Sequence, residues 1–217
     1  RNPLIIQEIT EIFNREDVKF DIFKKLVKKG SIVRAIITKN TKDKPRSFFD
    51  NIDKWAKEQG ASGLAYFTLE QDNKEIKAKG PVGKFFSEDA LKQIMKNYNM
   101  EIGDSIFFAC GKEKEVEKIL SLARNKIAQD LDIINKDIFA FCWIVDYPMY
   151  VFDENSKKII FSHNPFSMPQ GDIKKINYDK PLDIKAYQYD IVCNGVELSS
   201  GAIRNHIPEL MYKLFSV

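Results

Sequence analysis

AYQYDIVCNGVELSSGAIR, residues 186–204, combines a hairpin signal with two carboxylates and an arginine. Asn194-Gly195 is a dipeptide preferred in two-residue type I′ turns, because both central positions of that turn need a positive φ. A turn at this place brings Asp190 and Glu197 out on the same face of the hairpin, roughly 7–8 Å apart along the diagonal. The stretch therefore predicts an antiparallel hairpin that carries two acids on one face.

Two carboxylates on one face suit a hard divalent cation. Mg²⁺ binds one or two protein carboxylates and fills its other positions with water and nucleotide phosphate oxygens. Asp190 and Glu197 could thus anchor a metal-bound ATP. The alternative is an ordinary solvated strand face, because acids are common on exposed strands and the register of a hairpin can slip. The spacing alone leaves both interpretations open.

If the strand after the turn is unbroken, Arg204 points to the face opposite Glu197. A β-bulge within residues 199–202, Ser-Ser-Gly-Ala, would correct this, and small residues also let a ligand approach the backbone. A guanidinium presents a planar fork that matches a carboxylate bidentately. Arg204 is therefore predicted to bind an acidic side chain of a ligand.

The composition is that of an ordinary protein with a packed core, since 44% of the residues are hydrophobic. Lys and Arg number 34 against 31 Asp and Glu, so a nucleic-acid partner would need a local basic patch. The three cysteines show no C-x-x-C spacing and are expected to be reduced. No apolar run approaches the ~20 residues of a membrane span, and we expect a cytoplasmic protein without membrane contact.

Hydrophobic periodicity predicts alternating strands and helices over most of the chain. A helix is expected at residues 4–13, and a helix capped by Ser87 is expected to run to residue 98. The other expected elements are strands at 31–38, 64–69 and 104–110, helices at 47–59 and 113–131, a strand at 139–145 buried on both faces, and a hairpin at 149–161. Residues 80–84, GPVGK, lack the phosphate-loop pattern and are interpreted as a structural turn.

Three blocks carry a family resemblance. YDIVCNGVELSSGAIRNHIPEL (189–210), WIVDYPMYVFDE (143–154) and SHNPFSMP (162–169) resemble neighbouring catalytic blocks of bacterial-type aspartyl-tRNA synthetases, which are class II enzymes. The resemblance implies activation of L-aspartate with ATP and transfer to tRNA(Asp), and it leaves charging of tRNA(Asn) open. It implies that Asp190 and Glu197 hold Mg²⁺ and ATP. It also implies that Arg204 and His163 bind the substrate aspartate.

A second resemblance concerns the first two thirds of the chain. GASGLAYF (60–67), KGPVGKFF (79–86) and GDSIFFACG (103–111) resemble the GAD domain, which these synthetases carry inserted in the catalytic domain. The implied fold is α+β, with a GAD-type domain at 18–137. Residues 1–17 and 138–217 would then be catalytic-domain segments, continuous in space with each other. They would form an incomplete part of the class II antiparallel sheet.

The sequence departs from the family pattern at two places. His163 is followed by Asn164, where the family commonly has two adjacent histidines. Asn164 can donate and accept hydrogen bonds but cannot carry a proton charge, so any role of a second imidazole is in doubt. Residues 199–202 replace three glycines and a serine, and their extra Cβ atoms are expected to narrow the pocket slightly.

Several parts of such an enzyme have no counterpart in these residues: the arginine of the second class-defining motif, the final motif and the anticodon-binding domain. We therefore expect an inactive, monomeric fragment of an enzyme that is a homodimer when complete. The alternative is a non-catalytic tRNA-binding or interaction module, related to the GAD domain of tRNA-dependent amidotransferases. The combination of Asp190, Glu197 and Arg204 favours the enzyme.

Overall fold

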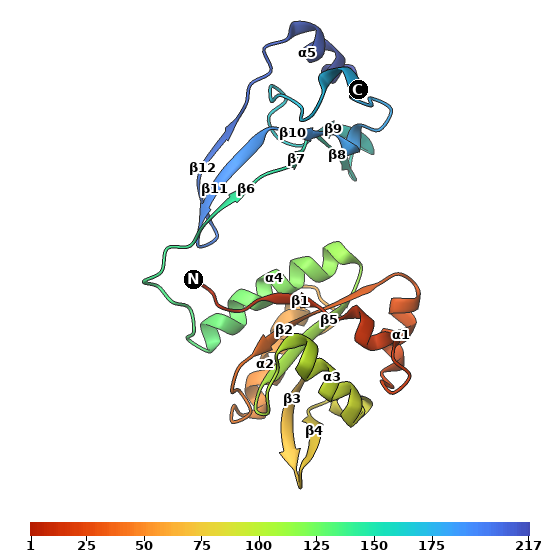
Figure 1. Cartoon of the computed structure of the whole chain (residues 1–217), viewed down its shortest axis with the longest axis vertical. Helices are drawn as coiled ribbons and strands as arrows, with labels where there is room; N and C mark the ends of the chain where they lie inside the picture. Colours follow the sequence, from red (N-terminus) through yellow and green to blue (C-terminus); the bar gives the residue numbers. More distant parts are fainter. The chain divides into compact units, whose positions relative to one another are not determined.

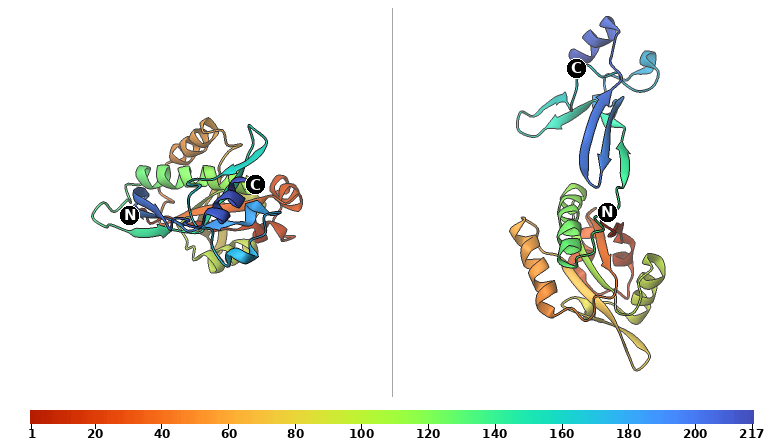
Figure 2. Two further views of the ribbon diagram at one scale, coloured as in Figure 1. Left: turned by 90° about the horizontal axis from the view of Figure 1, so that it is seen from above. Right: turned by 90° about the vertical axis from the view of Figure 1, so that its left-hand side faces the viewer.

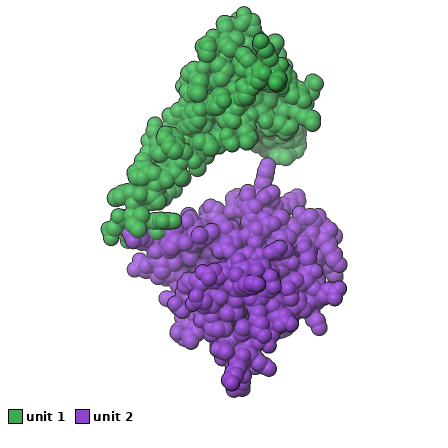
Figure 3. Space-filling view, viewed as in Figure 1, with its two compact units in different colours: residues 1, 136–217 green, residues 2–135 purple.

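The computed structural model describes residues 1–217 and divides the chain into two compact units. One unit contains Asn2–Asn135, and the other contains Lys136–Val217 together with Arg1 (Figure 3). Each unit has its own hydrophobic core, so each is described by itself.

The N-terminal unit is a five-stranded antiparallel sheet with helices on both faces (Figure 1). Its strand order is β1-β2-β5-β3-β4. The strands are β1 (Ile6–Glu8), β2 (Ile32–Thr38), β3 (Ala65–Asp72), β4 (Glu75–Lys79) and β5 (Ser105–Gly111). The helices are α1 (Asp21–Lys28), α2 (Arg46–Glu58), α3 (Glu88–Tyr98) and α4 (Glu113–Asp130).

The two faces of this sheet follow from the period of two along its central strands. On β5, Ile106 and Phe108 enter one core with side chains of α1 and α3, while Phe107 and Ala109 enter the other core with α2 and α4. Figure 2 (right) shows the two pairs of helices on opposite sides of the sheet. Because β5 is buried on both faces, it reads as the continuous apolar run IFFAC.

Most of the expected elements of this unit are confirmed. β2, α2, β3, α3, β5 and α4 lie within a few residues of the predicted ranges. The cap is confirmed too, since the Ser87 hydroxyl accepts a hydrogen bond of 3.0 Å from the backbone N–H of Ala90. Strand β4 was not predicted, although its sequence EIKAK alternates in polarity after the turn residues Asn73 and Lys74, which both have positive φ.

The expected helix at residues 4–13 is wrong. The structure has β1 there, followed by a 3₁₀ turn at Thr10–Asn14. β1 pairs with β2 in antiparallel register, and this ladder supplies hydrogen bonds that periodicity within a single segment does not reveal. Ile9 and Phe13, each 1% exposed, enter the core of this unit. Residues 2–17 thus fold with the domain that was expected to begin at residue 18.

The C-terminal unit contains three small antiparallel sheets and one α-helix. The largest has the strand order β12-β11-β6, and the others pair β10 with β7 and β8 with β9. Its strands are β6 (Phe141–Ile144), β7 (Tyr147–Pro148), β8 (Tyr150–Asp153), β9 (Lys158–Phe161), β10 (Lys185–Ala186), β11 (Gln188–Cys193) and β12 (Val196–Ala202), and its helix is α5 (Pro208–Phe215). The core joins α5 to the region around β8 and β10, through Met149, Tyr150, Ile184, Ala186, Leu210 and Leu214.

The strand at 139–145 forms as β6, but the expectation that it is buried on both faces is wrong. Phe141 is 62% exposed and Trp143 is 64% exposed. β6 is the edge strand of a three-stranded sheet, and the side chains of all its residues are exposed. The expected hairpin at 149–161 is confirmed by β8 and β9. None of the helices combines the length and the apolar character that crossing a membrane requires.

Candidate active site

The hairpin of β11 and β12 has the predicted turn. Asn194 and Gly195 have φ values of 50° and 87°, as a type I′ turn needs. Cys193 then pairs with Val196 on the opposite strand. The Asn194 side chain also attaches the turn to the segment before β6. Its Nδ2 donates to the carbonyl of Ile138 over 2.8 Å, and its Oδ1 accepts from the N–H of Ala140 over 3.0 Å.

A β-bulge in β12 changes the face on which later residues emerge. Val192 pairs with Glu197, whereas Ile191 pairs with Ser199, so Leu198 is the extra residue. The bulge therefore lies one residue before the predicted stretch 199–202. Its effect on the side-chain faces is the predicted one. Ser200 pairs with Asp190 and Ala202 pairs with Gln188, so both lie on the face that carries Glu197.

All four predicted site residues line one pocket of about 250 Å³. The pocket is formed by the hairpin, by β7 and by the loop after β9. It is lined by Tyr147, His163, Asn164, Gln188, Asp190, Glu197, Ser200, Gly201, Ala202 and Arg204. The structure therefore brings Asp190, Glu197, Arg204 and His163 together from segments up to 41 positions apart in the sequence.

Tyr147 connects the acidic side of the pocket to His163. Its hydroxyl donates a hydrogen bond to Oδ2 of Asp190, and its ring contacts the imidazole of His163 edge to face, with centroids 5.0 Å apart. This hydrogen bond, with desolvation and the charges of Asp190 and Glu197, raises the pKa of Tyr147 to about 12. The tyrosine is therefore a neutral donor at physiological pH. It holds one oxygen of the Asp190 carboxylate in place.

Gln188 attaches the His163 loop to the hairpin. Its side chain is buried, with the residue 6% exposed, and Nε2 donates to the carbonyl of Asn164 over 3.0 Å and to Oγ of Ser167 over 2.8 Å. Ser167 also forms a β-bridge with Arg204. These contacts attach the loop that carries His163 to β11 and to the backbone at Arg204.

Asn164 has a structural role in that loop. Its Oδ1 accepts a hydrogen bond of 2.9 Å from the backbone N–H of Phe166, which closes a tight turn. The residue that replaces the second histidine of the family pattern thus stabilises the loop next to His163. Tyr147 and Gln188 were not predicted as site residues. Their sequence neighbourhoods carry no signal of their own, because both act through partners distant in the chain.

The charges of the pocket are two carboxylates and one guanidinium. Arg204 forms no ion pair within the chain, so its planar fork remains free for a ligand. Asp190 and Glu197 are the only acids that line the pocket, and no group of three or more metal-binding side chains forms anywhere in the structure. Two hard carboxylates on one face nevertheless fit Mg²⁺, which takes its remaining ligands from water and phosphate. A nucleotide–metal complex at one end and an anionic group at Arg204 therefore match the pocket.

Comparison with known proteins finds a family model that matches most of the N-terminal unit. Residues 23–120 match the family model of the GAD domain. The matched residues lie within the compact unit Asn2–Asn135 and include α2, α3 and the four strands β2–β5. The similarity to the GAD domain thus concerns most of this unit.

The whole chain is similar to one kind of enzyme in particular. It is 73% identical over all 217 residues to the aspartate–tRNA(Asp/Asn) ligase of Pelagibacter ubique. It is 50% identical to the ligase of the same name from Ehrlichia chaffeensis and 49% identical to that from Zymomonas mobilis, again over its full length. The chain is thus a homologue of a segment of aspartate–tRNA ligases, and it spans 35–36% of the length of these relatives.

Proposed function

We propose that this chain is part of an aspartate–tRNA ligase whose complete form activates L-aspartate with ATP and transfers it to tRNA(Asp). The observation that carries the proposal is the single pocket that Arg204, Asp190, Glu197 and His163 all line. Its support is the identity of 73% along the full chain to a relative that bears this activity in its name.

Arg204 is proposed to bind the side-chain carboxylate of aspartate. Its guanidinium has no partner inside the protein, and two parallel N–H···O bonds to a carboxylate give both charge and geometric selectivity. His163 lies in the same pocket and is proposed to contact the bound amino acid. The ring of Tyr147 packs edge to face against the imidazole of His163.

Asp190 and Glu197 are proposed to hold Mg²⁺ and, through it, the phosphates of ATP. The ion would supply charge neutralisation on the phosphate oxygens while the leaving pyrophosphate departs. In activation, the α-carboxylate of aspartate attacks the α-phosphate, a new C–O–P bond forms, and the bond to pyrophosphate breaks. The two acids and Arg204 would contribute by fixing the two substrates at a reacting distance.

The acceptor and the assembly of the complete enzyme are part of the same proposal. The relatives are named for both tRNA(Asp) and tRNA(Asn), which supports both as acceptors. The family resemblance supports a homodimeric complete enzyme that acts in the cytoplasm. We propose that the 217-residue chain alone is a monomer. A non-catalytic tRNA-binding module is disfavoured, because binding of tRNA does not need a pocket that holds Asp190, Glu197 and Arg204.

The test uses the complete protein and follows ATP–pyrophosphate exchange. Exchange should depend on L-aspartate and should fall at least tenfold in Arg204→Ala, whereas Lys213→Ala on α5 serves as the control for loss of one positive charge. Exchange that responds equally to asparagine or glutamate, or that survives Arg204→Ala unchanged, would overturn the proposal.

A further inference from the structure

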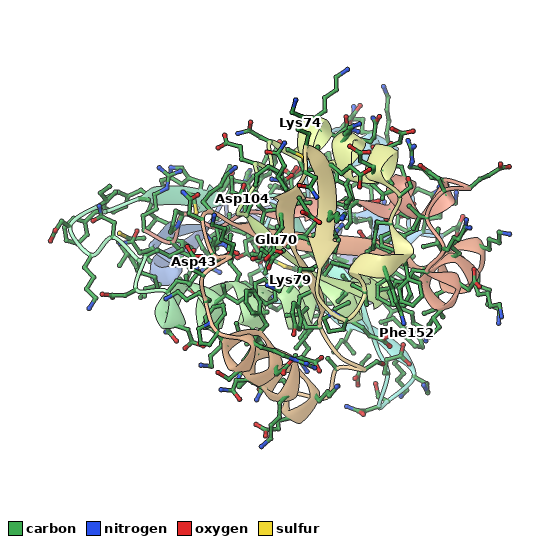
Figure 4. All side chains as sticks on the ribbon, turned by 90° about the horizontal axis from the view of Figure 1, so that it is seen from below. Asp43, Glu70, Lys74, Lys79, Asp104 and Phe152 are labelled. Atoms are coloured by element: carbon green, nitrogen blue, oxygen red, sulfur yellow. The ribbon has the colours of Figure 1, made fainter.

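A second pocket lies in the N-terminal unit, and its rim is basic. It encloses about 490 Å³, within the usual range of small-molecule sites. Four cationic side chains line it, from the loop after β2, the start of α2 and the end of β4: Lys42, Lys44, Arg46 and Lys79. Only one acid, Glu70, lines it. In Figure 4, Glu70 and Lys79 lie together on β3 and β4, and they form an ion pair of 3.1 Å.

Two of the four cations have no carboxylate partner. Arg46 pairs with Asp50 over 3.2 Å, as Lys79 pairs with Glu70. Lys42 forms no ion pair, and Lys44 has only the ring of Phe48, 5.8 Å from its Nζ. Asp43 stands between the two lysines in the sequence but does not line the pocket. The pocket thus keeps two uncompensated positive charges, which favours an anionic ligand.

The loop that carries these lysines is fixed by buried polar contacts. Asp104, 1% exposed, accepts hydrogen bonds from the backbone N–H of Asn40 over 3.0 Å and from Nζ of Lys39 over 2.8 Å. The buried hydroxyl of Thr41 bonds to Oγ of Ser105 over 2.8 Å. The backbone that leads to Lys42 and Lys44 is therefore held in place, so little backbone entropy is lost when they meet a ligand.

The floor of the pocket is partly aromatic. Phe49 on α2 and Tyr66 on β3 stack with centroids 4.9 Å apart, and both line the pocket beside Thr68. The Tyr66 hydroxyl donates to Asp50 over 2.7 Å, so its ring orientation is fixed. Gly80 completes the wall with a φ of 140°, and a Cβ there would lie 2.9 Å from the carbonyl oxygen of Tyr66. Phe49 and Tyr66 thus give the pocket an apolar side next to its basic rim.

We propose that this pocket binds a nucleotide through its phosphate, with Lys42 and Lys44 as the principal phosphate contacts and the base towards Tyr66 and Phe49. The phosphate could belong to a free nucleoside monophosphate or to an RNA strand, since both offer the same chemistry. The site is separate from the pocket of Asp190 and Arg204 and does not depend on its proposed function.

The test follows backbone amide resonances of the isotope-labelled 217-residue chain during titration with AMP, with inorganic phosphate, and with a short single-stranded RNA. Signals of Lys42, Lys44 and Gly80 should shift with AMP or RNA, and the affinity should fall as salt rises. If AMP shifts these signals, a free nucleotide is enough for binding. If only RNA shifts them, the ligand is an RNA strand.

Lys42→Ala/Lys44→Ala should weaken binding at least tenfold, because both charge-assisted contacts are lost. The matched control is Lys25→Ala/Lys28→Ala on α1, which removes two exposed positive charges outside the pocket and should change the affinity less than twofold. The proposal is overturned if neither AMP nor RNA shifts the pocket signals, or if the control variant weakens binding as much as the pocket variant.

Discussion

Replacing Arg204 by Lys in the complete protein keeps the positive charge but removes the planar, two-pronged geometry of the guanidinium, so the effect of that geometry can be measured alone. The backbone at this position is held independently of the side chain, by the bridge to Ser167 and by the N–H of Asn205, which donates to the carbonyl of Phe166 over 2.8 Å. The substitution should therefore leave the fold intact. A lysine can offer a carboxylate one strong hydrogen bond where the arginine offers two parallel ones.

The expected cost follows from that lost bond. One charge-assisted hydrogen bond contributes about 1.5–3 kcal/mol, which corresponds to roughly 10- to 150-fold in the specificity constant for aspartate. ATP does not contact Arg204 in the proposed arrangement, so its KM should change less than about threefold. The assay is ATP–pyrophosphate exchange, with aspartate and ATP varied in turn.

The matched control is Arg15→Lys, which makes the same exchange in the N-terminal unit and keeps a positive charge beside Asp17. It should leave both constants unchanged. Equal losses for aspartate and ATP in Arg204→Lys would refute the assignment of Arg204 to the substrate side chain. No loss for aspartate would refute it as well.

Four further outcomes are expected. Asp190→Asn and Glu197→Gln in the complete protein should each raise the Mg²⁺ concentration needed for half-maximal exchange, and the double variant should lose less than the sum of the two if both acids hold one ion. The 217-residue chain alone should show no exchange above a no-enzyme control, because its candidate site offers a single arginine against the charges of ATP; clear turnover would contradict this. Ser87→Ala should lower the free energy of unfolding by at least about 1 kcal/mol, because it removes both the α3 cap and the hydrogen bond to Asp17. The hydrogen bonds from Arg15 and Ser87 lower the pKa of Asp17 to about 2, so its stabilisation should be complete above the unfolded value near 3.8 and disappear as the pH falls through about 2. Asp17→Asn should therefore destabilise the chain in chemical denaturation at pH 7 but not near pH 1.5, and an equal loss at both would exclude ionisation as the cause.

The sequence predicts elements best where local chemistry and tertiary structure agree. The Asn194-Gly195 turn was predictable because positive φ at two positions restricts the residues that fit. The central strand β5 was predictable because burial on both faces leaves a continuous apolar run. The need for a bulge before Arg204 followed from side-chain parity alone. Its place at Leu198 did not, because small residues only permit a bulge and the strand pairing decides where it forms.

The predictions that failed, and the site residues that were missed, have a common physical cause: each depends on partners that are distant along the chain. The apolar spacing of residues 4–13 fits a helix, yet pairing with β2 makes part of it a strand. The run around Trp143 reads as buried, whereas the structure leaves that residue 64% exposed at the edge of a sheet. Tyr147 and Gln188 enter the candidate site through hydrogen bonds to residues 43 and 21–24 positions away, which no local pattern encodes.

The most direct measurement is a structure of the complete protein with Mg²⁺ and a non-hydrolysable analogue of aspartyl-adenylate. The account predicts that the analogue occupies the pocket of β11 and β12, with its side-chain carboxylate in two hydrogen bonds of about 2.7–2.9 Å to the Arg204 guanidinium. Asp190 and Glu197 should then lie beside the metal and phosphate. An analogue bound elsewhere, or a side-chain carboxylate held by residues other than Arg204, would contradict the account.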